Sequence, residues 1–332
     1  MDKVGIVIVT YNSASVIGPC LDSCLRQEGA EVLVIDNAST DSTLCEVARR
    51  PAARYIANST NVGFAAAVNQ GFAAIDAEFI LILNPDTVLT TSLEPLVAAC
   101  REPGIGAACG VLVNSSLEPQ FGFAVRRFPD ACTLAFEVLG WNRLFPGNAV
   151  NRRYRCLDLD LRADMDVEQP AGACLMVRKD AWKAVGGLDE SFYPVWFEDV
   201  DFCRRLHGHG YRIRLVSSVP VLHLGGHSVN KIAPRSRSAC WYGSLLRYAA
   251  KHFRQWELRT LCAVVMLASV PRAVIALRRE RSVEPVQAFF EVIRLAGLCL
   301  LSGRRLLERT NSNGAVRKQT HQYANTTSST GS

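Results

Sequence analysis

The sequence lacks the cysteine patterns that build zinc sites or disulfide frameworks. It contains 12 cysteines, but no CxxC pair is present and the residues are scattered, mostly within apolar runs. Such cysteines are typical of small buried side chains in a reducing compartment. The first apolar run, Val4–Thr10, is too short and too β-branched for a secretory signal peptide. We therefore expect no signal peptide and no disulfide scaffold.

A long membrane-spanning run, a dinucleotide-binding glycine motif and an internal repeat are also missing. The apolar run Thr260–Pro271 has only 12 uncharged residues between Arg259 and Arg272, whereas a bilayer-spanning helix needs roughly 20. This predicts no transmembrane helix. The first strand-like run is followed by Thr10–Ser15, which has no GxGxxG pattern. A dinucleotide-dependent oxidoreductase is therefore disfavoured.

The charge of the chain is unevenly distributed along its length. The 332 residues are 49% hydrophobic and 20% charged, with a net charge of +6, which is ordinary for one large or two modest globular domains. Residues 1–240 have a net charge of −3, from 23 basic and 26 acidic side chains, and residues 241–332 have +9, from 14 basic and five acidic. The C-terminal basic residues alternate with Leu, Val and Ala rather than with stacking aromatics. We therefore expect a membrane surface, and not a nucleic acid, as their partner.

Short apolar runs alternate with helix-like segments in the first third of the chain. Three runs predict strands, namely Val4–Thr10, Glu31–Asp36 and Phe79–Asn84, and the helix-like segments are Ser15–Gln27, Ser42–Arg49 and Phe64–Ile75. This alternation predicts an α/β fold with a mostly parallel sheet flanked by helices. Because ligands bind beyond the carboxyl ends of such strands, Thr10, Asp36 and Asp86 should gather at one edge.

The later segments complete the predicted domain and add a basic tail region. Residues 115–168 are loop-rich, and after them we expect a strand at Ala171–Arg178, helices at Asp180–Val185 and Glu198–His207, and a strand pair within Arg212–His223. Residues 241–310 have a basic amphipathic helical pattern, and residues 311–332 are Asn/Ser/Thr-rich and predicted to be disordered. The predicted division is a catalytic domain at 1–240, a helical region at 241–310 and a tail at 311–332.

Acidic residues and one histidine stand at predicted strand ends and at a helix start. Asp86 follows a strand, His223 ends another, and Glu198, Asp199 and Asp201 open a helix. A carboxylate and a distant histidine can hold a divalent cation beside a diphosphate, and a further carboxylate can act as a general base. The alternatives are helix-dipole charges for the acidic group and a buried core histidine for His223.

The ordered motifs, taken together, resemble one family. The chain, over roughly residues 3–230, resembles the inverting family-2 glycosyltransferases with a GT-A fold, and within them the rhamnosyltransferase-like branch of bacterial cell-surface polysaccharide biosynthesis. The motifs that carry the resemblance are Ile8–Asn12, Val34–Asp41, Asn61–Asn69, Leu83–Asp86, Ala171–Arg178, Val185–Glu190, Phe197–Asp201 and His223–Ser228.

The resemblance implies a role for each matching residue. It assigns the nucleotide-sugar pocket to Thr10, Tyr11, Asn12, Asp36, Asn61, Gly63, Asn69, Asn84 and Asp86. It assigns Asp86 and His223 to a metal, Mg²⁺ or Mn²⁺, and Asp199 to the catalytic base. It assigns the acceptor site to Gly172, Ala173, Trp196, Glu198 and Asp201. Asn84 replaces the first Asp of the family's DxD motif, which removes one negative charge and implies a metal that depends more on the donor phosphates.

The expected reaction is inverting transfer of L-rhamnose from dTDP-rhamnose to a polyprenyl-diphosphate-linked saccharide, with a UDP-hexose or galactofuranose donor as the alternative. The basic helical region would then hold the enzyme peripherally on the anionic cytoplasmic face of the inner membrane. A homodimer interface is the other use of that region. A non-catalytic membrane scaffold is disfavoured because Asp86, Asp199 and His223 are all present.

Overall fold

The computed structural model describes residues 3–225, 234–280 and 284–302. The chain forms two compact units. The sheet unit comprises residues 1–128 and 147–231, and the helical unit comprises 129–146 and 232–332. The predicted boundary at residue 240 therefore falls inside a helix, α11 (Pro234–His252). Segment 129–146 leaves the sheet unit and joins the C-terminal helices, which the charge pattern alone did not indicate. The tail at 311–332 lies outside the described residues.

The sheet unit is built on a nine-stranded mixed sheet with the order β3-β2-β1-β4-β10-β6-β11-β5, and β8 pairs with β11. Its strands are β1 (Val4–Thr10), β2 (Ala30–Asp36), β3 (Arg54–Ala57), β4 (Phe79–Leu83), β5 (Thr87–Leu89), β6 (Ile105–Val113), β8 (Met165–Val167), β10 (Cys174–Arg178) and β11 (Arg212–His223). Strands β3, β2, β1 and β4 pair in parallel, and β10 runs antiparallel to both β4 and β6. The predicted mostly parallel α/β sheet is confirmed.

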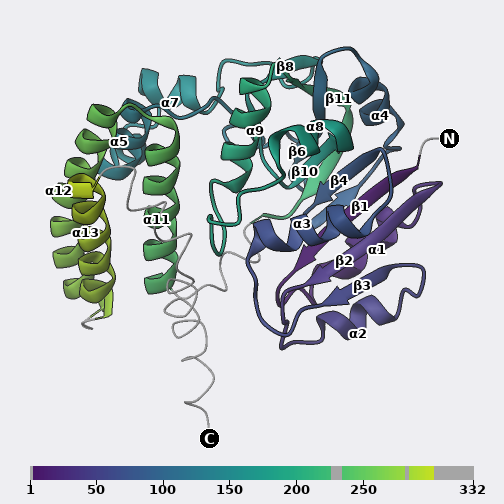
Figure 1. Ribbon diagram of the computed structural model, residues 1–332, viewed down its shortest axis with the longest axis horizontal. Coiled ribbons are helices and arrows are strands. Elements are labelled where there is room, and N and C mark those ends of the chain that lie inside the picture. The colour runs from purple at the N-terminus through teal and green to yellow at the C-terminus, as the bar shows by residue number, and fades with distance from the viewer. Residues whose placement is uncertain (1–2, 226–233, 281–283, 303–332) are drawn as a thin grey trace, which may run out of the picture. The chain divides into compact units, whose positions relative to one another are not determined.

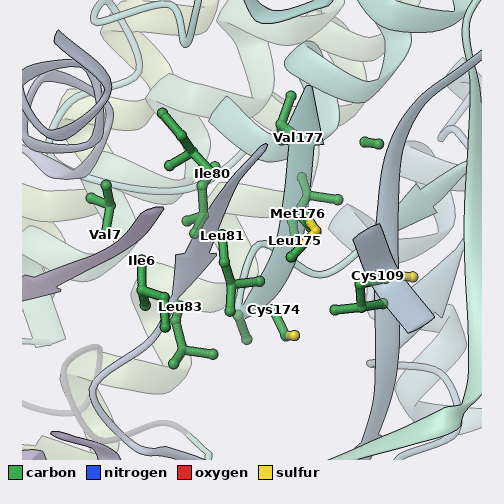
Figure 2. Packing of buried hydrophobic residues seen from close by; sticks show 14 of the residues in the cluster. Ile6, Val7, Ile80, Leu81, Leu83, Cys109, Cys174, Leu175, Met176 and Val177 are labelled. Carbon is green, nitrogen blue, oxygen red and sulfur yellow. The ribbon is translucent and has the colours of Figure 1, made fainter. Parts of the chain in front are cut away.

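The central strands are continuous apolar runs because both faces of the sheet are covered. Every residue of β4 is buried, and so are Ile6, Val7 and Ile8 of β1. Figure 2 shows Ile80, Leu81 and Leu83 of β4 beside the side chains of β10, including Leu175 and Val177. The expected strands at the start of the chain are confirmed within one or two residues.

Helices pack against the sheet unit's strands (Figure 1). They are α1 (Ile17–Cys24), α3 (Phe64–Ala74), α4 (Glu94–Arg101), α8 (Lys179–Val185) and α9 (Glu198–Gly208). The unit also contains α2 (Thr43–Ala48), which contacts α1, and α7 (Ala149–Tyr154). Helix α3 lies close on β1, since a Cβ added at Gly71 would come within 2.4 Å of Val7 Cγ1. A separate two-stranded ribbon joins β7 (Val125–Arg126) to β9 (Gln169–Pro170).

Two strands differ from the sequence expectation. The predicted strand pair at Arg212–His223 is one 12-residue strand, β11, whose pairing with β6 is interrupted between Val216 and Pro220. Strand β6 has the sequence IGAACGVLV, and its small residues do not give a strand-like apolar signal. The backbone of β11 needs those small residues, because a Cβ at Gly110 would lie 2.4 Å from the carbonyl oxygen of Val219.

The helical unit contains α5 (Ala131–Leu139), α6 (Trp141–Leu144), α11, α12 (Gln255–Glu280) and α13 (Glu284–Ser302). Helix α12 packs against α5, α11 and α13 (Figure 1). Asp130 caps α5 by accepting a hydrogen bond from Thr133 N at 2.7 Å, and Gly140, with φ of 75°, allows the turn into α6.

One described helix is long and apolar enough to cross a membrane by length and composition. The segment is Gln255–Ile275 of α12, and a third of its apolar window is buried inside the protein. The count of 12 uncharged residues underestimated the length of this apolar segment, because the helix continues beyond Arg259 on one side and Arg272 on the other. A core helix of a soluble protein has the same length and composition, so this feature alone does not place the helix in a bilayer.

Candidate active site

The carboxyl ends of β1, β2 and β4 meet at one edge of the sheet, as parallel pairing requires. The register pairs Thr10 with Asp36 and Ile8 with Leu83. Strand β10 runs the other way, so its first residue, Cys174, lies opposite Leu83, and Asn84 N donates to Ala173 O at 3.0 Å. The edge therefore collects the residues after three strands and the residues before a fourth.

Asp36 is buried at this edge and its carboxylate is held by neighbouring side chains. Thr10 Oγ1 donates to Asp36 Oδ1 at 2.7 Å, and Ser39 donates twice, from Oγ to Oδ1 at 2.5 Å and from N to Oδ2 at 2.9 Å. Three donors already occupy a group that the resemblance assigns to the nucleotide-sugar pocket. The contacts of Asp36 and Thr10 thus order the loop that carries Ser39.

Asn12 ties the end of β1 to the loop after β2. Its backbone lies in the left-handed region with φ of 52°, its N donates to Ser39 Oγ at 2.8 Å, and its Oδ1 accepts from Thr40 N at 2.7 Å. Tyr11 is half-buried beside it. These contacts place Tyr11 and Asn12 at the pocket edge, with the Asn12 amide oxygen used by the protein.

The Asn61–Gly63 turn approaches another backbone segment closely. Gly63 has φ of 89°, its N donates to Asn61 Oδ1 at 2.9 Å, and a Cβ there would lie 2.8 Å from Tyr193 Cδ2. Tyr193 OH in turn donates to Asn61 O at 3.2 Å. Glycine is thus needed at this position because the Tyr193 ring packs against it.

Asn69 makes its amide contacts with the loop after α8. Its Nδ2 donates to Leu188 O and to Glu190 Oε1, each at 3.0 Å, and its Oδ1 accepts from Leu188 N at 3.0 Å. These bonds join α3 to the 187–190 loop. Asn69 therefore positions that loop, and its place in the nucleotide pocket remains a prediction.

Asp86 and His223 lie side by side, as the metal assignment requires. Strand pairing sets His223 opposite Thr87, the residue after Asp86, and His223 Nε2 lies 3.7 Å from Asp86 Oδ1. Both are buried. Gln120 fixes the imidazole, because its Nε2 donates to His223 O at 2.7 Å and its Oε1 lies 2.9 Å from His223 Nδ1.

When the His223 ring is neutral, two hydrogen-bond acceptors face each other, namely His223 Nε2 and the Asp86 side chain. Burial lowers the pKa of His223, and the Asp86 charge opposes that shift only in part. In the neutral ring, Nδ1 donates to Gln120 Oε1, so Nε2 presents a lone pair toward the Asp86 carboxylate. A cation between them would satisfy both groups, and an oxygen with an imidazole nitrogen is a set that Mn²⁺ and Mg²⁺ accept. Among the described residues, no three His, Cys, Asp or Glu side chains form a metal cluster, so further ligands would come from substrate and water.

Asp199 stands at the start of α9 and is held from two sides. Its Oδ2 accepts from Gly172 N at 3.1 Å and from Gln169 Nε2 at 3.5 Å, while its Oδ1 accepts from Val200 N at 2.8 Å. A Cβ at Gly172 would lie 3.3 Å from Asp199 Cβ. Gly172 thus permits the close approach that fixes the carboxylate.

The backbone that leads into α9 is strained. Trp196 and Phe197 both have positive φ, 83° and 69°, although neither is glycine. Two consecutive non-glycine residues in this region cost free energy, and such strain gathers at functional sites. The turn places Glu198 and Asp199 together at the first turn of the helix.

The two adjacent carboxyl groups differ in protonation. Burial raises the pKa of Glu198 well above its ordinary range, and the Asp199 charge raises it further. Burial also raises the pKa of Asp199, but hydrogen bonds from Gly172 and Val200 and the charge of Arg126 act against it. Glu198 Oε2 is buried without a hydrogen-bond partner among the described residues. Burial therefore favours the neutral acid more strongly at Glu198 than at Asp199, whose charged form is supported by hydrogen-bond donors, a division typical of catalytic pairs.

Asp201 belongs to the scaffold more than to the predicted acceptor site. It is fully buried and forms an ion pair with Arg205 at 2.8 Å. Arg205 also donates to the carbonyl oxygens of Val185 and Gly187 at the end of α8. Asp201 thus fixes α9 against α8 and positions Asp199 indirectly. Ala173 is buried, and Trp196 is half-buried at the same edge.

Sequence reasoning missed three polar residues at this site. Gln120 orients His223, Gln169 contacts Asp199, and Arg126 lies near Asp199 in the ribbon that Gln169 completes. All three come from the loop-rich segment between β6 and β10 or its ends. No periodic pattern marks them, so only the folded structure brings them to the site.

The fold and the site are typical of α/β enzymes that use nucleotide sugars. Hydrogen bonds fix the Asp199 carboxylate at the start of a helix, and Asp86 and His223 form a pair at the sheet edge. The chain belongs to glycosyl transferase family 2, whose model matches residues 5–182. It is 31% identical over 308 residues to N-acetylglucosaminyl-diphospho-decaprenol L-rhamnosyltransferase of Mycobacterium tuberculosis, covering 84% of this chain and 96% of that protein.

Two further likenesses agree with that family. Rhamnosyltransferase WbbL of Escherichia coli K12 is 23% identical over 188 residues, which are 55% of this chain and 66% of that protein. The solved structure of GalNAc-T7 with UDP, GalNAc and Mn²⁺ matches with a TM-score of 0.53 at 15% identity, over 76% of this chain and 50% of that one. This last likeness bears on the fold, which is that of a GT-A glycosyltransferase.

Proposed function

We propose that this glycosyltransferase moves L-rhamnose from dTDP-rhamnose to a saccharide linked to a polyprenyl diphosphate, with inversion at the anomeric carbon. The support for the sugar and the acceptor is the similarity to the mycobacterial rhamnosyltransferase along nearly its whole length. The single structural observation that carries the chemistry is the Asp199 carboxylate, fixed by Gly172 N and Val200 N beside a neutral Glu198.

Asp199 acts as the general base in the proposed reaction. Its carboxylate takes the proton of an acceptor hydroxyl as that oxygen forms a bond to the anomeric carbon of the donor. The bond from the anomeric carbon to the diphosphate oxygen breaks, and the nucleoside diphosphate leaves with the electron pair. Glu198, Gly172, Ala173 and Trp196 surround the acceptor in this assignment.

The donor would lie across the carboxyl edge of the sheet. Tyr11, Asn61 and Gly63 border the nucleotide, and Thr10, Asn12, Asp36 and Asn69 keep the pocket loops in place through the bonds described above. Asp86 and His223 would hold Mg²⁺ or Mn²⁺ next to Asn84. The bound cation would supply charge neutralisation for the leaving diphosphate.

The helical unit offers a surface for peripheral membrane binding. Its described residues expose large apolar side chains at Leu139, Trp141, Leu144, Phe145, Trp256, Leu267, Val270, Val274, Ile275, Leu277, Phe290 and Leu301. Basic side chains are also exposed in this unit, at Lys251 of α11, at Arg254 in the connection to α12, and at Arg259 and Arg278 of α12. Apolar burial together with attraction to anionic lipid is how interfacial helices bind. An acceptor in the cytoplasmic leaflet would be reached from such a position.

A donor screen with an active-site variant tests the proposal. The wild-type enzyme with Mn²⁺ or Mg²⁺ and a polyprenyl-diphosphate N-acetylglucosamine acceptor should release dTDP from dTDP-rhamnose faster than it releases UDP from UDP-hexoses or UDP-galactofuranose. Asp199→Asn should lower kcat by roughly 10²–10⁴-fold, while Asp158→Asn, at an exposed position, should retain full activity. Turnover by Asp199→Asn at the wild-type rate would refute the assignment of the base.

A further inference from the structure

We propose that Arg126 is a diphosphate-binding residue of this active site, an assignment that rests on the proposed sugar transfer from a nucleoside diphosphate. The described residues hold its guanidinium group in place near enough to act on the charge of Asp199, and the Phe123 ring lies between it and His223. Its terminal nitrogens have no partner among those residues. The ligand chemistry that fits is a pair of phosphate oxygens. The donor and the lipid-linked acceptor both contain a diphosphate, and the experiment below separates them.

The position of Arg126 follows from the two-stranded ribbon. Arg126 pairs directly with Gln169 across β7 and β9, and side chains of directly opposed residues lie on the same face of a ribbon. Gln169 Nε2 lies 3.5 Å from Asp199 Oδ2. The positive charge of Arg126 is near enough to Asp199 to favour its carboxylate form. The ribbon therefore delivers a cation next to the proposed base.

Arg126 is held in place by its neighbours. Its Nε donates to Gly122 O at 2.9 Å. Its guanidinium carbon lies 5.7 Å from the centroid of the Phe123 ring and 5.8 Å from that of Tyr154. Two cation–π contacts and one hydrogen bond fix a planar group that would otherwise lose conformational freedom on binding a ligand.

The same aromatic ring connects Arg126 to the predicted metal pair. Phe123 stacks on the His223 imidazole with centroids 5.1 Å apart and planes at 8°. His223 in turn faces Asp86. A diphosphate bound at Asp86 and His223 would therefore be separated from the Arg126 guanidinium by one aromatic ring.

The terminal nitrogens of Arg126 remain available. They make no hydrogen bond or ion pair with any residue that the structure describes. By contrast, the adjacent Arg127 pairs with Glu168, and Arg155 donates to Asn151 Oδ1. Arg126 is also half-buried, where a guanidinium without an anion is less stable than one that is paired. A guanidinium fork matches two phosphate oxygens in geometry and charge.

The experiment uses the full chain and two kinds of ligand. Arg126→Gln removes the charge, Arg126→Lys keeps the charge without the fork, and Arg153→Gln removes an exposed charge of the same type from α7 as the control. Calorimetry with Mn²⁺ measures binding of dTDP, UDP and GDP, and of thymidine, which lacks the diphosphate. Steady-state kinetics measures KM for the lipid-diphosphate acceptor and for a lipid glycoside without diphosphate.

Two results support the proposal and identify the source of the diphosphate. If the donor is bound, Arg126→Gln weakens dTDP binding by about tenfold or more, leaves thymidine binding unchanged, and Arg126→Lys recovers part of the loss. If the acceptor is bound, dTDP binding is unchanged and KM rises about tenfold for the diphosphate acceptor only. Arg153→Gln should match the wild type in both assays.

A different result overturns the proposal. Affinities for every nucleoside diphosphate and for the diphosphate acceptor within twofold of wild type in a folded Arg126→Gln protein, or in Arg126→Lys if only that variant folds, would mean that Arg126 only packs the ribbon or tunes Asp199. The proposed function fails separately, if the wild-type enzyme transfers no rhamnose from dTDP-rhamnose. The binding comparison with dTDP, UDP and GDP still reports on Arg126 in that case.

Discussion

At the scale of single residues, the site is a set of acceptors whose donors are supplied by backbone and neighbouring side chains. Asp199 receives hydrogen bonds from Gly172 N and Val200 N, and Asp36 receives them from Thr10 and Ser39. The donors to Asp199 act against the rise in its pKa that burial causes and so favour its charged form. Glu198 has no such donor for its Oε2 among the described residues and stays protonated. Which carboxyl group can act as the base thus depends on which one receives hydrogen bonds from nearby backbone N–H groups.

The raised pKa of Asp199 sets the acid side of the pH–rate profile. The base must be ionised, and burial raises its pKa, so kcat/KM should fall with decreasing pH at a higher pH than for an unperturbed aspartate. Removing the opposing charge with Arg126→Gln should move this acidic limb to still higher pH. Profiles of kcat/KM from acidic to mildly alkaline pH would check both, and a limb that moves to lower pH in Arg126→Gln would contradict the electrostatic contact.

The protonated Glu198 predicts a pH-dependent gain in stability on substitution. When the pKa of a carboxyl group is higher in the folded protein than in the unfolded chain, as for Glu198, the free energy of unfolding falls as pH rises, because the unfolded chain releases the proton first. Glu198→Gln has nearly the same shape and no such loss. At mildly alkaline pH, the Tm of Glu198→Gln should exceed that of the wild type by a few degrees. Each kcal/mol of added stability raises Tm by on the order of 2–4 °C.

The Tm difference between Glu198→Gln and the wild type should become smaller as the pH is lowered toward the ordinary pKa of glutamate, where the unfolded chain also keeps its proton. Scanning calorimetry across this pH range gives the comparison, with Glu118→Gln, an exposed position, as the control. A Tm difference that is independent of pH would show that the pKa of Glu198 is not raised in the folded protein.

At the scale of elements, the sheet edge could be predicted from sequence and the ribbon could not. The runs Val4–Thr10 and Phe79–Asn84 are continuously apolar because both sheet faces are covered. The polar residues at their ends could therefore be identified from the sequence. Strand β6 is rich in Gly and Ala because β11 passes close to it, and small residues give no such signal. Arg126 and Gln169 lie on two-residue strands, whose pairing depends on contacts far apart in sequence.

The close passage of β11 along β6 predicts a steric effect at Gly110. A Cβ at this position would lie 2.4 Å from Val219 O, a backbone atom that cannot rotate away. Gly110→Ala should therefore destabilise the sheet unit by roughly 1–3 kcal/mol, the usual range for overpacking. Gly208→Ala is the matched control, because a Cβ at this exposed position in α9 meets nothing within 4 Å. Urea unfolding of both variants measures the difference, and equal midpoints would contradict the close β6–β11 packing.

At the scale of the whole molecule, the charge asymmetry follows the division into units only in part. The negative residues 1–240 include the carboxylates of the site, while the +9 of residues 241–332 lies in the helical unit and its continuation. Segment 129–146, however, leaves the sheet unit and adds exposed Trp141, Leu144 and Phe145 to the helices. The proposed docking surface therefore includes side chains from the middle of the sequence, which composition could not assign to it.

Peripheral binding and membrane insertion of α12 predict different extraction behaviour. Helix α12 has the length to span a bilayer, but a third of its apolar window is buried against protein and Tyr242 accepts a hydrogen bond from Arg272. An interfacial helix held by exposed Leu267 and Ile275 and by cationic side chains should bind anionic vesicles and leave them at high salt or alkaline pH. A spanning helix would remain with the membrane under both treatments.

The full-length Leu267→Gln/Ile275→Gln variant tests the surface directly. The two side chains are 72% and 62% exposed, so the substitutions should leave the fold and soluble-acceptor turnover intact. Losing two apolar contacts of roughly 1.5–3 kcal/mol each should lower partitioning onto anionic vesicles by at least about tenfold. Thr260→Ala, at an exposed position on the same helix, serves as the control and should bind vesicles as the wild type does. Unchanged vesicle binding would contradict the proposed docking surface, and a change in oligomeric state in its place would assign this face to a second subunit.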